Sequence, residues 1–193
     1  MQIRVLVLFS GRWAFRMMED PPEIRKTQPE ASENQIKKRV WIKASAEIVY
    51  RALTESRELQ RWFCDQASCD LREGGELLAC WKTGKSLQKG RAVFSRLVPG
   101  VSLELLWIDD GTDPESKNSS HTLSYEIRSK SGMTELIMID KDDSPSDEET
   151  RAFFDQGWNS VLLELKDFCE RREREAKLRV LSKSGAQKSD AEK

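Results

Sequence analysis

The residues in this sequence that are best suited to chemistry are large aromatics, which recognise a ligand through apolar contact. Six of them fall in segments that we expect to be helices or strands: Trp62, Trp81, Phe94, Trp107, Phe154 and Trp158. Large aromatics most often fill a hydrophobic core, and core packing is one interpretation of this set. They can also leave a hollow where a helix and a sheet splay apart, and they then form the walls of a binding cavity.

Residues for acid–base or nucleophilic chemistry are scarce by comparison. His121 is the single histidine of the sequence, and no nucleophile motif accompanies it. Because it begins a predicted strand, we expect it at the surface or at the rim of a pocket. The aspartate pairs at 109–110 and 142–143 fall in predicted turns, where aspartate stabilises the local backbone. We therefore predict no catalytic residue.

The sequence does not indicate a metal site or a phosphate site either. Its four cysteines lack the C-x-x-C spacing of a zinc site, so we expect reduced thiols. Gly74 and Gly75 lie between two predicted strands, whereas a phosphate-binding loop opens a helix. This glycine pair predicts a tight turn. We predict no metal and no cofactor.

The elements that must position these residues follow a regular order. Residues 36–43 alternate in polarity, which predicts a strand, and Ser45 suits the N-cap of a helix pair ending near Trp62. Six further strands are predicted between turn residues, at 68–72, 76–82, 87–98, 101–108, 121–128 and 134–139. Short turns join most of these strands, so we predict an antiparallel meander.

A long amphipathic helix is predicted after the last strand. Acidic residues at 147–149 suit a helix N-terminus. The apolar residues that then recur at helical spacing are Phe154, Trp158, Val161, Leu162, Leu165 and Phe168 or Cys169. Between residues 170 and 177 the sequence is almost wholly charged, so we expect the final turns to lie in solvent. The apolar face of such a helix must pack on the apolar face of the sheet.

Length and charge limit the classes of function. The chain has 193 residues, 38% of them hydrophobic, with 32 basic and 33 acidic side chains, which suits one domain with tails. A net charge of −1 gives no electrostatic case for nucleic acid or an anionic membrane as a partner. No run approaches the roughly 18 apolar residues of a membrane span, and the apolar segment at 5–9 has no cleavage site after it. We expect a cytoplasmic protein.

Composition also predicts the limits of the domain. Residues 1–34 are rich in polar residues and prolines towards their end, which predicts a disordered or extended segment. Residues 179–193 show no apolar periodicity over their last part, which predicts a disordered tail. The domain itself is expected to span residues 35–178.

Seven collinear pieces of this sequence resemble the activator of heat-shock protein 90 ATPase homologue-like family, of the START-like (SRPBCC) superfamily. Residues 36–40 and 44–54 look like the family's opening strand and its A-P-P-E-x-V-W-x-A-L-T helix, although the usual proline is absent and Tyr50 replaces the tryptophan. Residues 71–76 resemble its D-x-R-x-G-G turn. The remaining matches are Trp62 and Phe63, Gly90, Pro99 with Leu103 and Trp107, Thr134 with Leu136, and Gly157 and Trp158 with Leu162 and Leu165.

The resemblance implies an α+β helix-grip fold, in which a curved antiparallel sheet wraps around a long C-terminal helix. Related domains often hold a hydrophobic cavity between sheet and helix. This favours the cavity interpretation for the six aromatics, which become predicted ligand-binding residues, with Trp81 and Trp107 facing Trp158. Within the 193 residues the activator's separate chaperone-binding domain has no counterpart, so we expect ligand binding ahead of chaperone stimulation.

Three functions remain open at this point. The first is non-enzymatic binding of a small hydrophobic or aromatic ligand, by a monomer or a homodimer. The second is a chaperone-associated protein-interaction domain, with the charged 170–177 segment as its surface. The third is an enzyme of the cyclase or hydratase kind, which would need buried ionisable groups. We expect the inward positions to be almost entirely apolar, which favours the first function over the third.

Overall fold

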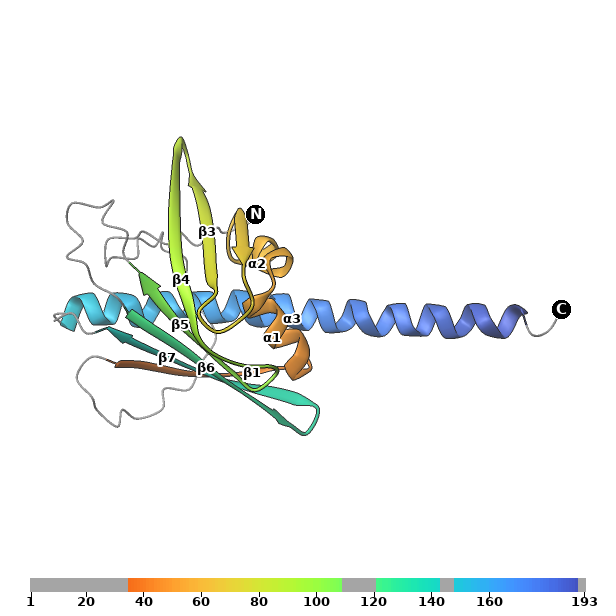
Figure 1. Ribbon diagram of the computed structural model, residues 1–193. Coiled ribbons are helices and arrows are strands. Elements are labelled where there is room, and N and C mark those ends of the chain that lie inside the picture. The colour runs from red at the N-terminus through yellow and green to blue at the C-terminus, as the bar shows by residue number, and fades with distance from the viewer. Residues whose placement is uncertain (1–34, 109–120, 143–147, 191–193) are drawn as a thin grey trace.

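The computed structural model describes residues 35–108, 121–142 and 148–190 of the chain. Its elements are β1 (Gln35–Ile42), α1 (Ala46–Thr54), α2 (Ser56–Trp62), β2 (Gln66–Cys69), β3 (Glu76–Thr83), β4 (Ser86–Val98), β5 (Ser102–Ile108), β6 (His121–Lys130), β7 (Met133–Asp142) and α3 (Glu148–Asp190). Figure 1 shows the sheet lying across α3. This is the order of elements that the sequence predicts. The predictions for residues 1–34, 109–110, 143, 147 and 191–193 fall outside the described residues.

The strands of the described residues join one seven-stranded antiparallel sheet. Its order is β1-β7-β6-β5-β4-β3-β2, so β2 to β7 pair in sequence order as the predicted meander. Strand β1 returns to pair with β7, which places Ile36 opposite Asp140. The curved sheet around a long C-terminal helix confirms the predicted α+β helix-grip fold.

The register of β6 against β7 depends on the turn between them. Ser131 and Gly132 both have positive φ values, 51° and 75°. A two-residue hairpin turn of type I′ requires this combination, and glycine adopts it without strain. The resulting register places Leu123 opposite Asp140 and thereby decides which side chains of β7 face the helix.

The turn before β3 differs in extent from the prediction. Strand β2 ends at Cys69 rather than at residue 72, because the backbone turns at Asp70. The Asp70 carbonyl accepts the Arg72 N–H at 2.8 Å, and the Arg72 carbonyl accepts the Gly75 N–H at 2.9 Å. A Cβ on Gly75 would lie 2.1 Å from the Asp70 carbonyl oxygen, so only glycine fits there. The glycine pair is therefore the tight turn that we predicted.

The short helix pair begins and ends as predicted. Ser45 is the N-cap of α1, and its hydroxyl accepts the N–H of Ile48 at 3.4 Å. The carboxylate of Glu173 on α3 accepts the N–H of Ser45 at 3.1 Å. The long helix therefore also fixes the point at which α1 starts.

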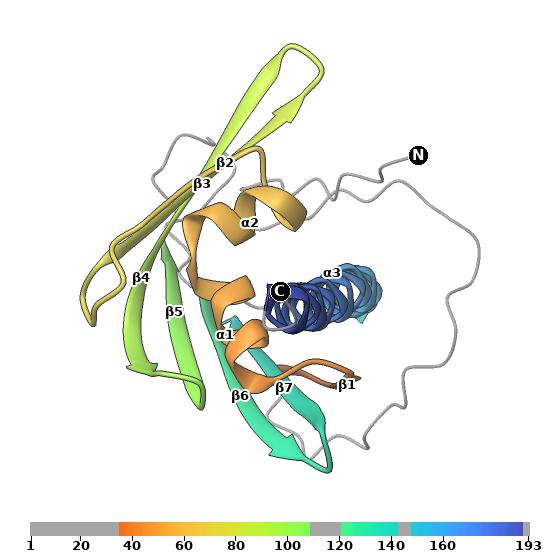
Figure 2. The same cartoon turned by 90° about the vertical axis from the view of Figure 1, so that its right-hand side faces the viewer.

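Helix α3 lies against the concave face of the sheet; α1 packs between α3 and strands β6 and β7, and α2 packs against β2 and α3. Figure 2 looks along α3 and shows the sheet curving around it. The buried side chains that α3 contributes are Trp158, Val161, Leu162, Leu165, Phe168 and Cys169, which confirms the predicted apolar face. Opposite them lie buried residues from every strand from β3 to β7, among them Leu77, Phe94, Leu105, Leu123 and Met138.

The end of α3 projects from the domain (Figure 1). The helix continues to Asp190, whereas the sequence predicted a disordered tail from residue 179. Strong helix formers in this stretch are Arg179, Leu181, Lys183, Ala186, Gln187 and Lys188, which alternate with serines and Gly185. The exposed side chains of Leu178, Val180 and Leu181 lie on this projection. Among the described helices, none has a stretch long and apolar enough to span a membrane.

Candidate functional site

Two of the six predicted site residues, Trp62 and Trp81, pack around α2. The Trp62 indole N–H donates to the Ala52 carbonyl at 2.9 Å, and the Trp81 indole N–H donates to the Phe63 carbonyl at 2.8 Å. The Phe63 ring lies 5.3 Å from each indole. Trp62 also stacks on Phe168 of α3, at 6.4 Å between ring centroids. These contacts hold the helix pair against β3 and α3.

Two further predicted residues lie at the other end of the sheet and contact ionisable groups. Trp107 on β5 is directly opposite His121 in the β5–β6 register, and their rings stack at 6.2 Å with an interplanar angle of 14°. Trp158 on α3 donates its indole N–H to Oδ2 of Asp140 at 2.7 Å. Both tryptophans are 3% exposed. This end of the domain therefore combines aromatic walls with polar atoms.

The remaining two predicted residues, Phe94 and Phe154, lie outside these two groups of contacts. Phe94 on β4 is fully buried and belongs to the core. Phe154 on α3 is half-buried, and its ring lies 6.0 Å from that of Phe153, which is 37% exposed. Binding of a ligand by any of the six stays a prediction.

Asp140 is unusual because it is a buried carboxylate with only one of its two oxygens hydrogen-bonded among the described residues. It is 8% exposed, and Oδ1 has no hydrogen-bond partner among the described residues, while Oδ2 accepts the bond from Trp158. Burial raises the pKa of this carboxyl, because a charged form loses its hydration there. The charge of His121 and the bond from Trp158 oppose that rise in pKa only in part.

Two neighbours of Asp140 on the inward face, His121 and Tyr125, are also polar. Nε2 of His121 is buried and has no hydrogen-bond partner within the described part of the chain. Tyr125 on β6 is 6% exposed, and burial followed by the nearby charge of Asp140 raises the pKa of its hydroxyl. These groups lie where β6, β7 and the first half of α3 meet. We call Trp107, His121, Tyr125, Asp140 and Trp158 the polar–aromatic site.

The expectation of an almost wholly apolar inward face is therefore wrong at this end of the sheet. Sequence reasoning missed Asp140 and Tyr125 as site residues. A signal was present, because Leu136, Met138 and Asp140 alternate along β7 and so share a face. Lys38 is buried as well, and its Nζ lies 2.6 Å from an Asp155 carboxylate oxygen.

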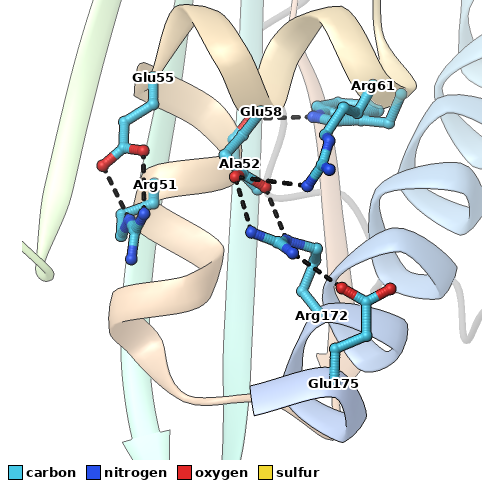
Figure 3. Close-up of polar contacts among 8 residues, drawn as sticks. Arg51, Ala52, Glu55, Glu58, Arg61, Arg172 and Glu175 are labelled. Atoms are coloured by element: carbon cyan, nitrogen blue, oxygen red, sulfur yellow. Dashed lines mark hydrogen bonds and ion pairs between the residues drawn. The ribbon is translucent and has the colours of Figure 1, made fainter. Parts of the chain in front are cut away.

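A second buried carboxylate, Glu58 on α2, has a different environment. It is 7% exposed, and both of its oxygens accept hydrogen bonds at 2.9 Å from the guanidinium of Arg172 on α3. Figure 3 shows this bidentate pair, with Glu175 bound to the other side of Arg172 at 2.8 Å. The pair joins two helices and leaves neither carboxylate oxygen without a partner.

Several solved structures share this fold. CalU16 from Micromonospora echinospora is 21% identical, with a TM-score of 0.53 over 70% of this chain and 75% of that chain. The Aha1 dimer from Colwellia psychrerythraea is 23% identical, with a TM-score of 0.56 over 70% and 96% of the two chains. An HSP90 activator from Plasmodium falciparum is 17% identical, with a TM-score of 0.51 over 66% and 89%. These likenesses concern the fold.

A comparison with curated proteins found no match to this sequence. The family comparison is decisive, because one family matches residues 43–170, well over half of the chain. This confirms the resemblance carried by the motifs between residues 36 and 169. The chain belongs to the family of activator of Hsp90 ATPase homolog 1-like proteins.

Proposed function

We propose that this protein binds a small, largely apolar molecule between α3 and the hollow face of the sheet, at the polar–aromatic site. The observation that carries this proposal is the buried Oδ1 of Asp140, which has no hydrogen-bond partner among the described residues. A buried polar atom without a partner costs about 1–3 kcal/mol, and native proteins rarely keep one. A bound molecule would supply the missing partner.

The surroundings of this oxygen support a mostly apolar ligand. Leu105, Leu123 and Met138 lie at inward positions of the adjacent strands β5, β6 and β7, and Leu105 is two residues before Trp107 on β5. On the facing helix, Val161 is buried one turn after Trp158. Small-molecule sites in proteins combine such apolar walls with a few converging polar groups.

Tryptophan fluorescence during titration tests the proposal. The titrants are flavonoids, fatty acids and other hydrophobic molecules, and a thermal shift is measured for each. We expect at least one titrant to change the fluorescence and to raise the melting temperature. Trp107→Phe and Trp158→Phe should weaken that response. Trp41→Phe is the matched control, because Trp41 is 36% exposed and lies on the edge strand β1.

Two outcomes would contradict binding at this place. The absence of any response across the panel counts against a ligand, and an equal loss of response in Trp41→Phe counts against the site. The bound molecule should be recovered unchanged after incubation. Chemical conversion would instead favour an enzyme of the cyclase or hydratase kind, for which Asp140 and His121 are suitable acid–base groups.

We propose a chaperone-associated interaction as the second candidate function. Membership of the family supports it, and so does the projecting end of α3, where Leu178 and Leu181 are 66% and 67% exposed. Exposed apolar side chains of this kind mark surfaces that contact other proteins. The surface would lie just beyond the charged 170–177 segment that the sequence predicts.

A purified chaperone ATPase assay tests the second candidate. We expect the chain to stimulate the ATPase of Hsp90 and the double variant Leu178→Ser with Leu181→Ser to lose that stimulation. Leu87→Ser is the control, because Leu87 is 50% exposed on β4, away from α3. Absence of stimulation by the unaltered chain would contradict this function.

A further inference from the structure

Two of the buried polar atoms without a hydrogen-bond partner among the described residues, Nε2 of His121 and Oδ1 of Asp140, belong to adjacent strands and to the same face of the sheet. His121 begins β6, and Leu123, two residues on, is directly opposite Asp140 in β7. His121 and Asp140 are therefore diagonal neighbours, at a Cα separation of roughly 7–8 Å in an antiparallel pair. Among the described residues, no hydrogen bond joins Nε2 of His121 or Oδ1 of Asp140 to any other side chain. A single group of a ligand can therefore form hydrogen bonds with both atoms.

The chemistry of the two atoms determines which group satisfies both. Oδ1 of an ionised Asp140 only accepts hydrogen bonds, and its second oxygen is already bound to Trp158. Nε2 of His121 donates a hydrogen bond in the tautomer that carries its proton there. A single atom between them must donate to the carboxylate and accept from the imidazole. A hydroxyl group does both.

The side chains around these two atoms determine what kind of molecule carries the hydroxyl group. The rings of Trp107 and His121 stack nearly parallel, at 6.2 Å between their centroids and with an interplanar angle of 14°. Trp158 supplies a second indole from the helix, within hydrogen-bond distance of the same carboxylate. Flat apolar surfaces of this kind favour an aromatic ring in offset-stacked or edge contact.

Charge excludes another class of ligand from this position. Asp142 lies close enough to Asp140 for its charge to raise the pKa of the Asp140 carboxyl. A ligand carboxylate placed against Oδ1 would add a further negative charge beside these two carboxyls, in a buried place where a charged group loses its hydration. Fatty acids and aromatic acids are therefore unsuited to this position in the orientation that a hydroxyl would take.

We propose that the polar–aromatic site selects hydroxylated aromatic molecules. The hydroxyl donates to Oδ1 of Asp140 and accepts from Nε2 of His121, and the ring lies against Trp107 and Trp158. This rests on the proposed binding function and deepens it by naming the ligand class. A ligand without the hydroxyl leaves both protein atoms buried and unpaired, which is the strongest form of discrimination that a polar group provides.

A matched set of three probes tests this selectivity in the full chain. The probes are 2-naphthol, naphthalene and 2-naphthoate, followed by fluorescence titration. We expect 2-naphthol to bind at least about tenfold more tightly than naphthalene, because an unpaired buried polar group is costly. We expect 2-naphthoate to bind no more tightly than naphthalene.

Variants assign the selectivity to the two atoms. Asp140→Asn and His121→Phe should each reduce the preference for 2-naphthol over naphthalene several-fold, while the affinity for naphthalene stays within about twofold. Thermal melts verify that each variant is folded, and either variant alone suffices for the test. Glu126→Gln is the control, because it removes the same charge at an exposed position between Tyr125 and Ile127 on β6.

The outcomes separate this inference from the proposed function. If 2-naphthol and naphthalene bind equally, or if the preference survives both variants, hydroxyl selection at these atoms is wrong while ligand binding stands. If neither probe binds, and the wider panel also gives no response, both proposals are wrong. A tenfold preference lost in Asp140→Asn and His121→Phe but kept in Glu126→Gln supports both.

Discussion

Glu58 on α2 and Asp140 on β7 are both buried carboxylates, with 7% and 8% of their surface exposed. Both oxygens of Glu58 are bound by the guanidinium of Arg172, a bidentate pair between two residues 114 positions apart in sequence. Asp140 has one oxygen bound by Trp158, and the other has no partner among the described residues. Similar burial thus accompanies two very different degrees of hydrogen bonding.

This difference separates a structural contact from a candidate binding site. A buried ion pair with every acceptor bound is self-sufficient and needs no further molecule. A buried carboxylate with only one oxygen hydrogen-bonded costs free energy, because its second oxygen is without water and without a donor. A ligand that donates a hydrogen bond to that second oxygen removes this cost. Burial alone would have ranked the two residues together, so the distribution of partners is what distinguishes them.

The largest expected effect is the loss of stability on breaking the bound pair. Arg172→Ala leaves Glu58 buried without its main partner, and we expect the free energy of unfolding to fall by about 3 kcal/mol. Urea denaturation measures it. The double variant Glu58→Leu with Arg172→Leu should recover much of the loss, because it removes both charges. A fall below about 1 kcal/mol in Arg172→Ala would show that Arg61, 3.9 Å from Glu58, replaces the lost partner.

The second effect has the opposite sign. Asp140→Asn keeps the acceptor for Trp158 and removes a buried charge, so we expect stability at pH 7 to rise by about 1 kcal/mol. The sign follows from linkage: burial raises the pKa of Asp140 in the folded state above the ordinary aspartate value, so stability is lost as pH rises from that ordinary value through the raised pKa. Thermal melts between pH 4 and pH 8 measure this. A marked loss of stability in Asp140→Asn would assign Asp140 to the fold rather than to a site.

A third carboxylate provides an intermediate case. Burial and then the charge of Asp167 raise the pKa of Glu164 from 4.5 to about 7. The folded state therefore holds this proton longer than the unfolded state, and stability is lost as pH rises from 4.5 through 7. Glu164→Gln should remove that component of the pH dependence and give a slightly higher melting temperature at pH 8. An unchanged profile would mean that solvent screens this carboxylate fully.

The smallest effect comes from a pair with the same geometry but in solvent. Arg51 and Glu55 on the helix pair also form a bidentate contact, at 2.8 and 3.2 Å, but their side chains are 46% and 38% exposed. We expect Arg51→Ala to change the free energy of unfolding by less than about 0.5 kcal/mol, because water screens the pair. Figure 3 shows this pair beside Glu58 and Arg172. Equal losses in Arg51→Ala and Arg172→Ala would mean that burial does not decide the strength of the contact.

The sequence predicted the fold much better than it predicted the site. Ser45 as the N-cap and Trp62 as the end of the helix pair follow from local patterns, and the structure confirms both. The sequence indicated the aromatic residues of the site by their residue type, and the structure places Trp107 and Trp158 beside ionisable groups. Asp140 was overlooked, although its alternation with Met138 on β7 was readable.

Other features could not have been read from the sequence at all. The position of Asp140 beside His121 requires the register set by the Ser131 and Gly132 turn. Trp62 and Trp81 looked equivalent to Trp107 in the sequence, but their indole N–H groups are bound by backbone carbonyls of Ala52 and Phe63. Partners of this kind depend on how separate elements meet.

The sequence by itself determined the elements, their order, the apolar face of the long helix and membership of the family. It could do so because hydrophobic periodicity and turn residues act over a few neighbouring positions. Only the tertiary structure decided which buried polar atoms find partners, since Glu58 and Arg172 are brought together across 114 positions and Asp140 faces the helix through a strand register. The distribution of hydrogen-bond partners distinguishes the Glu58–Arg172 contact, which holds α2 to α3, from the polar–aromatic site, where we expect a ligand.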